Sequence, residues 1–308
     1  MLGRLASSWG LFIGAMSLGW GLGQRGVLTE ARANRLLRFA VKWLSPVVLC
    51  LSFWSLEVGG RGVAWVPIIG ALACLAALGP SWLYARRAHL NRPQTGSFLT
   101  CAMFSNVGYI GAFVAFALFG ESGYGVGVWY LVYFTPCFYL IGMTIAMRFG
   151  SQTPDAAATS PFSEELRLFP FAGMLLGSLL HLTHCPRPEV LGWVNHVLIP
   201  IDTAIHLMAV GSQIHVGPFT GFWKPALAMS AIKFVYTPLV SWALASATRL
   251  DGLPRFVVLL QGAMPVAVSP LMLAVVFRLD RRFSSALWFF TNLLAIPWLF
   301  LYVPLIRP

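Results

Sequence analysis

Long apolar segments, separated by short polar or charged breaks, run through almost the whole sequence. A helix needs about 20 apolar residues to cross the hydrocarbon core of a bilayer, and about ten segments reach that length. They lie near residues 6–24, 36–56, 62–84, 96–119, 124–148, 167–185, 191–214, 223–247, 255–277 and 284–306. The sequence therefore predicts an all-α, polytopic membrane protein with about ten transmembrane helices, called spans one to ten below.

The composition excludes an ordinary soluble domain and argues against a nucleic-acid partner. Of the 308 residues 58% are hydrophobic and only 10% are charged, and the mean hydropathy is +0.75. The net charge of +11 comes from cations in the short breaks between spans, with no basic domain. Cations retained at the cytoplasmic side of a membrane explain this charge better than nucleic acid does.

The distribution of cations orients the spans. Thirteen Lys or Arg residues lie in the breaks after odd-numbered spans, against six on the opposite side. The positive-inside rule then places both termini outside the cytoplasm. We expect an integral, multi-pass protein of the plasma (inner) membrane.

The longest polar break divides the spans five and five. It covers residues 150–166, is rich in Pro, Ser, Thr and Ala, and is typical of a flexible cytoplasmic linker. An odd number of spans in each half gives residues 1–149 and 167–308 opposite orientations, as in an inverted repeat. Leu44-Ser45-Pro46 in span two and Leu198-Ile199-Pro200 in span seven occupy corresponding places.

Spans four and nine carry helix-breaking residues near mid-membrane. Span four contains Asn106, Gly108 and Gly111, and span nine contains a run from Gln261 through Pro265 to Ser269. Gly and Pro weaken or break helices, and Asn competes for backbone hydrogen bonds. We therefore predict that both helices are broken, which lipid tolerates only where the freed groups face protein or a water-filled cavity.

The two breaks are the candidate substrate site. Half-helix N-termini there would present N–H groups and positive dipole ends to an anion. The candidate substrate-binding residues are Asn106, Gly108, Gly111, Gln261, Pro265 and Ser269. The alternative is that the two glycines only permit close helix packing. Two breaks in corresponding positions of the halves favour a binding site.

Three ionisable residues inside the spans are candidates for proton or ion coupling. Asp202 and His206 lie four apart on one face of span seven, and either form a proton relay or make a structural hydrogen bond near Pro200. Lys233 in span eight is a potential counter-ion to Asp202 or to a substrate carboxylate. We favour a third interpretation, in which its long stem snorkels to the cytoplasmic interface.

The sequence carries no pattern typical of an enzyme or a metal protein. The five cysteines form neither metal-ligand spacing nor a disulfide framework, and the loops are too short for a soluble active site. We expect no catalytic residue, no metal site and no cofactor apart from a coupling H⁺ or Na⁺.

Five short stretches, taken together, are distinctive. They are Gly19–Leu28, Asn106–Gly111, Phe119–Gly123, Ala209–Ser212 and Ala263–Ala267. Together they resemble the auxin efflux carrier family of permeases over nearly the whole chain. The resemblance implies ten helices in two inverted halves, with broken helices four and nine crossing at the substrate site. It also implies a homodimer, and a division into a transporting part (spans three to five and eight to ten) and a scaffold (spans one, two, six and seven).

Two positions depart from the family pattern. Phe113 stands where the family usually has a proline, and Ser269, followed by Pro270, stands where it usually has an asparagine. These changes alter the shape and hydrogen bonding of the crossing, so they affect the substrate more than the fold.

The function that we expect is secondary transport, by alternating access, of a small organic anion such as an auxin-like or other carboxylate, in the direction of efflux. The first alternative is a sodium-coupled organic-anion symporter of the bile-acid type. The second is an intramembrane enzyme acting on lipid, for which Asp202 and His206 are the only pair that could serve.

Overall fold

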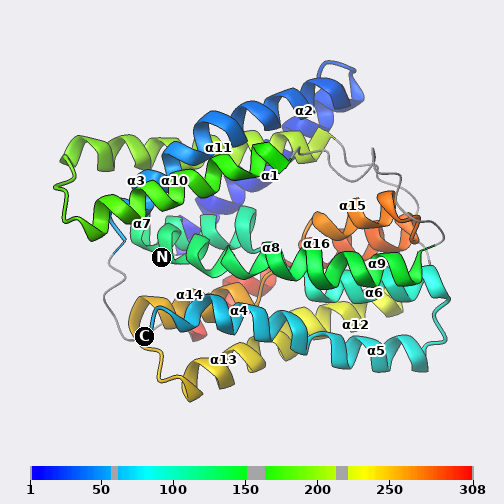
Figure 1. Cartoon of the computed structure of the whole chain (residues 1–308). Helices are drawn as coiled ribbons and strands as arrows, with labels where there is room; N and C mark the ends of the chain where they lie inside the picture. The colour runs from blue at the N-terminus through cyan, green and yellow to red at the C-terminus, as the bar shows by residue number, and fades with distance from the viewer. Residues whose placement is uncertain (1, 57–61, 151–163, 213–220, 307–308) are drawn as a thin grey trace. The chain divides into compact units, whose positions relative to one another are not determined.

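The computed structural model describes residues 2–56, 62–150, 164–212 and 221–306. These residues are helical apart from short connections and a single isolated antiparallel bridge (Figure 1). Most of the predicted linker, residues 151–163, lies outside the described part. The expectation of an all-helical chain is confirmed.

The described residues contain seven helices that are long and apolar enough to span a membrane, not ten. The difference has a physical cause. Spans four and nine are broken into shorter helices, the second half of span four continues into span five over Val107–Phe149, and the apolar part of span six is short, Leu168–Leu182. The count of ten crossings and the inverted repeat remain predictions.

The chain divides into two compact units, each drawn from separate parts of the sequence. The first unit consists of Met1–Gly59, Ala112–Val126 and Ser160–Val216. Its helical elements are α1 (Leu2–Gln24), α2 (Glu30–Phe39), the π-helical η1 (Ala40–Leu44), α3 (Ser45–Trp54), part of α7 (Phe113–Tyr130), α10 (Glu164–Leu182) and α11 (Glu189–Ser212).

The second unit consists of Gly60–Gly111, Gly127–Thr159 and Gly217–Pro308. Its elements before the linker are α4 (Trp65–Ala76), α5 (Leu78–Arg87), α6 (Arg92–Met103), η2 (Val107–Ala112), η3 (Leu131–Tyr133), α8 (Phe134–Cys137), η4 (Phe138–Gly142) and α9 (Met143–Phe149). Those after it are α12 (Trp223–Ala231), η5 (Ile232–Tyr236), α13 (Thr237–Ala247), α14 (Gly252–Gly262), α15 (Ser269–Val276) and α16 (Arg281–Leu305).

The grouping of spans agrees with the division that the resemblance implies, with one exception. Spans one, two, six and seven contribute to the first unit, and spans three, eight, nine and ten to the second. The exception is Ala112–Val126, the end of span four and the start of span five, which clusters with the first unit; the rest of span five lies in the second. The halves 1–149 and 167–308 are defined by repeat symmetry and not by contact, so they remain a prediction.

Small residues allow close helix packing in the first unit. Gly173 and Gly177, four apart on α10, lie where a Cβ atom would collide with the backbone of Pro46 and Cys50 on α3. Gly19 of α1 lies in the same way against the backbone of Met208 on α11. Close backbone approach at small residues is a common way to join helices in lipid.

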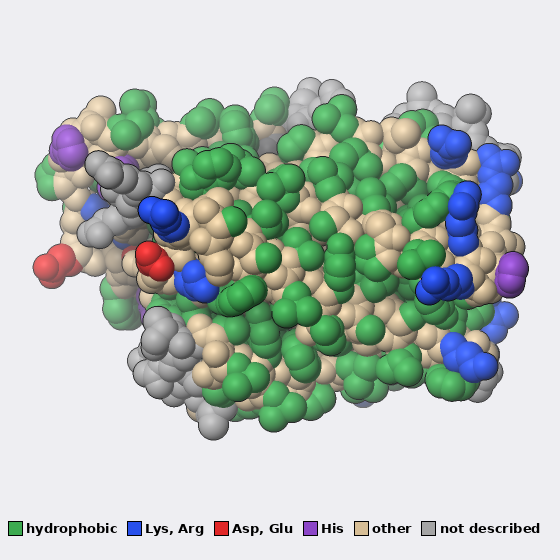
Figure 2. Space-filling model, turned by 90° about the horizontal axis from the view of Figure 1, so that it is seen from below, with side chains coloured by type: hydrophobic (Ala, Val, Ile, Leu, Met, Phe, Trp, Pro, Cys, Tyr) green, Lys and Arg blue, Asp and Glu red, His purple; other side chains and the backbone are tan. Residues whose placement is uncertain are grey.

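Large apolar side chains are exposed on both units. The exposed fractions are 72% for Leu182 and 71% for Trp193 in the first unit, and 72% for Leu140 and 79% for Leu305 in the second. Figure 2 shows hydrophobic side chains over much of the visible surface. A surface of this kind fits a lipid environment, where exposed apolar groups carry no penalty.

Candidate functional site

The breaks in spans four and nine meet as a short antiparallel ribbon within the second unit. Ser105 lies opposite Val266. The backbone N–H of Asn106 donates to the Pro265 carbonyl at 2.7 Å, and the backbone N–H of Ala267 donates to the Phe104 carbonyl at 3.0 Å. Backbone that leaves the helix inside a membrane must find partners in the protein. Each break provides partners for the other, so the predicted breaks in both helices are present and joined.

Aromatic packing fixes the end of α6 at the ribbon. Phe104, the C-cap residue, adopts an extended conformation and is fully buried. Its ring lies 5.2 Å from that of Phe134 and 5.5 Å from that of Phe138, measured between centroids. A side chain at Gly142 would collide with the Phe104 ring. Packing of this large ring therefore stabilises the point at which the helix stops.

Span ten holds the other side of the ribbon. The hydroxyl of Thr291 accepts from the Val266 amide at 3.3 Å, and the side-chain amide of Asn292 donates to the Val266 carbonyl at 3.1 Å. Both side chains belong to α16 and are buried. They satisfy the groups of Val266 that point away from span four, and thereby fix the non-helical backbone of span nine.

Span eight caps the first halves of both broken helices. The Lys233 ammonium donates to the Ala102 carbonyl in the last turn of α6 at 2.6 Å. One turn later, the Thr237 hydroxyl donates to the carbonyl of Gly262, the last residue of α14, at 2.7 Å. Carbonyls at helix C-termini lack intrahelical partners. Lys233 lies in the π-helical segment η5, a kind of distortion that is frequent at functional sites.

Lys233 does not snorkel, so our preferred interpretation of this residue is wrong. Its exposed fraction is 0%, and its ammonium also donates to the Ser105 hydroxyl at 2.8 Å. Two hydrogen bonds and the negative end of the α6 dipole offset part of the cost of burying the charge. In the described part of the chain the two ion pairs are Arg187–Glu121 and His206–Asp202, and neither involves Lys233.

The two glycines of span four have different surroundings. A Cβ atom at Gly111 would overlap the side-chain oxygen of Gln261 and lie 3.1 Å from Met264. At Gly108 it would meet only the methyl groups of Leu131 at 3.7 Å, an ordinary contact. Close packing is therefore present at Gly111, whose neighbour Gln261 is another candidate site residue, and absent at Gly108.

Three buried polar atoms near the breaks have no hydrogen-bond partner among the described residues. They are Gln261 Oε1, Ser269 Oγ and Asn292 Oδ1. Gln261 is 1% exposed, and its amide nitrogen donates to the Gly127 carbonyl at 3.3 Å. Ser269 is the first residue of α15. Unsatisfied buried groups are costly, so their presence in span nine, before and after the ribbon, and in span ten points to a polar ligand or ordered water.

Asp202 and His206 belong to the first unit, unlike all the other candidate residues. The Asp202 carboxylate accepts from the Ser45 hydroxyl at 3.0 Å and lies 3.6 Å from the His206 ring nitrogen Nδ1. Seven residues away on each helix, the Asn195 amide donates to the Ser52 hydroxyl at 2.9 Å. The two contacts form a polar ladder between antiparallel α3 and α11, which the sequence had not indicated.

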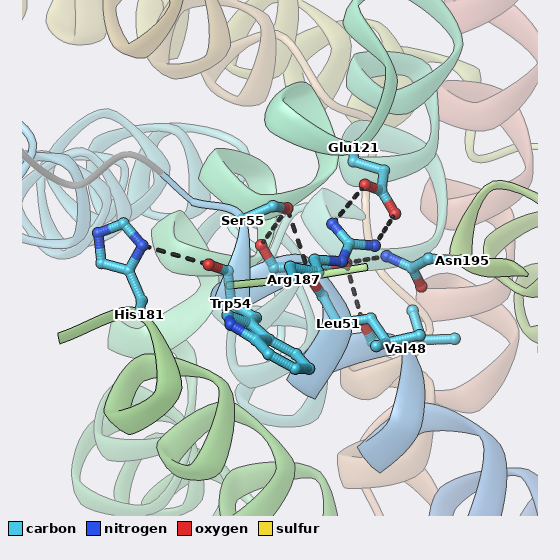
Figure 3. A network of polar contacts seen from close by, with 9 residues as sticks. Val48, Leu51, Trp54, Ser55, Glu121, His181, Arg187 and Asn195 are labelled. Atoms are coloured by element: carbon cyan, nitrogen blue, oxygen red, sulfur yellow. Dashed lines mark hydrogen bonds and ion pairs between the residues drawn. The ribbon is translucent and has the colours of Figure 1, made fainter. Parts of the chain in front are cut away.

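A second polar network ties the loop after span six to neighbouring elements of the first unit (Figure 3). Arg187 donates to both carboxylate oxygens of Glu121 at 2.8 and 3.0 Å. Gly120, at φ 66°, interrupts α7 just before Glu121 and so lets span five start there. The Trp54 indole donates to the Cys185 carbonyl at 2.8 Å. This network anchors Ala112–Val126 within the first unit.

Sequence reasoning located the breaks but missed several residues that hold them. Ser105, Thr237, Thr291 and Asn292 were not among the candidates. The pair Thr291-Asn292 offered a usable signal, because adjacent polar residues at the middle of an apolar span are unusual and costly. Ser105 offered the same signal, because it is followed directly by Asn106. Thr237 gave no such signal, since an isolated hydroxyl group can bond to its own helix.

An all-helical chain with an apolar surface, and with two broken helices joined at buried polar groups, defines a multi-pass membrane protein of the transporter class. Comparison with known proteins identifies the family. The model of the membrane transport protein family matches residues 11–166 and 158–303. The chain belongs to this family, which is a family of transporters and not of enzymes. The resemblance drawn from the sequence is thus confirmed at the level of the family.

Two archaeal relatives cover most of the chain. An uncharacterized transporter of Methanothermobacter thermautotrophicus is 23% identical over 283 residues, which are 91% of each chain. An uncharacterized transporter of Methanocaldococcus jannaschii is 22% identical over 281 residues, which are 87% of each chain.

Proposed function

We propose that the protein is a secondary transporter that carries a small organic anion, such as a carboxylate, out of the cell by alternating access. The observation that carries the proposal is the ribbon between the breaks of spans four and nine, next to a buried cation. Substrate sites of secondary transporters commonly lie at discontinuous helices near mid-membrane.

The polarity of the site supports an anionic substrate. Lys233 supplies a positive charge at the ribbon, and the N-terminus of α15 supplies the positive end of a helix dipole. The Ser269 hydroxyl, at that N-terminus, has no partner in the described chain and is free to donate. Asn106, which is 4% exposed, lies in the ribbon itself. In this proposal Asn106, Gly108, Gly111, Gln261, Pro265 and Ser269 surround the substrate.

Alternating access requires two bodies, and the division into two compact units supports this part of the proposal. The first unit would act as the scaffold and the second as the transporting part. We also infer a homodimer in the plasma (inner) membrane with both termini outside the cytoplasm, from the family resemblance and the distribution of cations. The Asp202–His206 pair is the candidate for proton coupling.

A sodium-coupled symporter is the second candidate function. The oxygens Gln261 Oε1 and Asn292 Oδ1 are buried acceptors without a partner among the described residues, and a cation would satisfy them. The two functions differ in whether substrate binding needs sodium.

Thermal unfolding of the purified protein tests the proposal, because a ligand that binds the native state raises its apparent stability. We would screen monocarboxylates, dicarboxylates, amino acids and bile acids in sodium chloride and in choline chloride. We expect a monocarboxylate to stabilise the protein in both salts. Stabilisation that requires sodium would instead favour the symporter, and no stabilisation by any carboxylate would contradict the proposal.

Asn106→Ala tests the location of the site. We expect this variant to fold and to lose carboxylate binding. The matched control is Asn91→Ala at the other end of α6, where the side chain caps the helix by accepting from the Gln94 amide at 2.9 Å. The control should lose about 1 kcal/mol of stability and keep its affinity. Unchanged affinity in Asn106→Ala would remove the ribbon as the substrate site.

A further inference from the structure

The Lys233 ammonium is a buried cation held by oxygen atoms. It donates to the Ala102 carbonyl at 2.6 Å and to the Ser105 hydroxyl at 2.8 Å, and its exposed fraction is 0%. In the part of the chain that the structure describes, no carboxylate forms an ion pair with it. The charge therefore has hydrogen-bond partners but no counter-ion.

These oxygens are of the kind that bind a coupling cation in secondary transporters. Unwound backbone and the C-terminal ends of half-helices coordinate sodium in proteins of this architecture. Ala102 lies in the last turn of α6, at the negative end of the helix dipole, and Ser105 lies in the unwound segment. The ammonium thus occupies a site whose donor set and electrostatics suit a monovalent cation.

We propose that Lys233 is a built-in cation that takes the place of a coupling sodium ion at the ribbon and balances the charge of one substrate carboxylate. This inference rests on the proposed function and deepens it. It assigns a substrate class, the monocarboxylates. One fixed positive charge compensates one carboxylate, whereas a dicarboxylate would bring a second charge into a low-dielectric site without a partner.

A ligand-free experiment tests the cation site. Lys233→Ala removes the atoms Cγ to Nζ, and n-propylammonium supplies those same atoms. We expect the thermal midpoint of the purified variant to rise in n-propylammonium chloride relative to choline chloride, because choline has no N–H donor. Wild type and Lys224→Ala, which alters an exposed lysine earlier in the same span, should not respond. A folded Lys233→Ala that responds to neither n-propylammonium nor sodium would overturn the proposal.

A binding experiment tests the charge balance. It uses Lys233→Met, so that the test can still be made if Lys233→Ala does not fold. Methionine fills much of the same volume without the charge. We expect its affinity for a monocarboxylate to fall about ten- to a hundredfold, as for loss of a hydrogen bond to a charged group. Lys224→Ala should bind as wild type does. Equal affinity in Lys233→Met, or a sodium requirement in wild type, would contradict the built-in cation.

The two proposals fail in different ways. If Asn106→Ala loses binding and Lys233→Met keeps it, the ribbon remains the substrate site and the role of Lys233 is wrong. If no carboxylate binds wild type, the proposed function fails, and the response of Lys233→Ala to n-propylammonium still decides whether the oxygens form a cation site.

Discussion

Gly111→Ala should disrupt the packing between the broken helices, and Gly108→Ala should not. The added Cβ atom at Gly111 overlaps the side-chain oxygen of Gln261 and comes within 2.8 Å of its Cδ atom. Gln261 is 1% exposed, so its side chain can move only by disturbing its surroundings and its 3.3 Å hydrogen bond to Gly127. Overpacking costs about 1–3 kcal/mol, and a lost hydrogen bond adds about 1 kcal/mol.

The matched substitution gives the prediction its control. At Gly108 the new methyl group meets Leu131 at 3.7 Å, so no neighbour must move. Replacing a helical glycine also lowers the entropy of the unfolded chain, which is worth about 0.5–1 kcal/mol. We therefore expect Gly108→Ala to unfold at or slightly above the wild-type temperature, and Gly111→Ala several degrees below it.

Thermal unfolding of the three purified proteins in the same detergent measures these differences. Gln261→Ala removes the clashing atoms, so Gly111→Ala should cost less in that background, as a double-mutant cycle would reveal. Equal midpoints for Gly108→Ala and Gly111→Ala would refute the reasoning, because they would mean that span four does not pack against Gln261 as described.

Two further predictions concern the first unit. Glu121→Gln removes the counter-charge of Arg187, whose side chain is only 11% exposed, and should therefore lower the thermal midpoint. The double variant Glu121→Gln/Arg187→Gln should recover part of this loss. A Glu121→Gln variant as stable as wild type would contradict the anchoring role. Asp202→Asn keeps an acceptor for the Ser45 hydroxyl but cannot titrate, so transport into proteoliposomes should lose its pH dependence. The control variant Ser45→Ala should keep that pH dependence. A wild-type pH profile in Asp202→Asn would mean that Asp202 has only a structural role.

The sequence predicted the helices and the positions of the breaks, because both depend on local chemistry. Apolar length indicates a span, and Asn106, Gly111 and Pro265 mark positions where a helix is weak. The antiparallel pairing of the two breaks depends on contacts between residues about 160 positions apart, such as Asn106 and Pro265. A pattern along a single chain does not encode that register.

Lys233 shows most clearly where reasoning from sequence fails. A lysine a third of the way into a span has the same local pattern whether its stem reaches the interface or its ammonium caps a neighbouring helix. The choice depends on which atoms lie across from it. Here they are the end of α6 and Ser105, and neither can be located without the tertiary structure.

The sequence did not predict the polar ladder between α3 and α11, for a related reason. Ser45 and Ser52 are unremarkable residues in an apolar span, and their importance comes from facing Asp202 and Asn195 at the same seven-residue interval. Only the register of the two antiparallel helices turns four scattered polar residues into a connected set.

The ribbon also determines how the two broken helices can move. Because the backbone amides of Asn106 and Ala267 each donate to the opposite break, displacement of one unwound segment along the other would break both hydrogen bonds. Spans four and nine are thus joined by hydrogen bonds at the positions where each helix is broken. We therefore expect a ligand that binds one segment to move both helices together, because moving one segment alone would break the two hydrogen bonds.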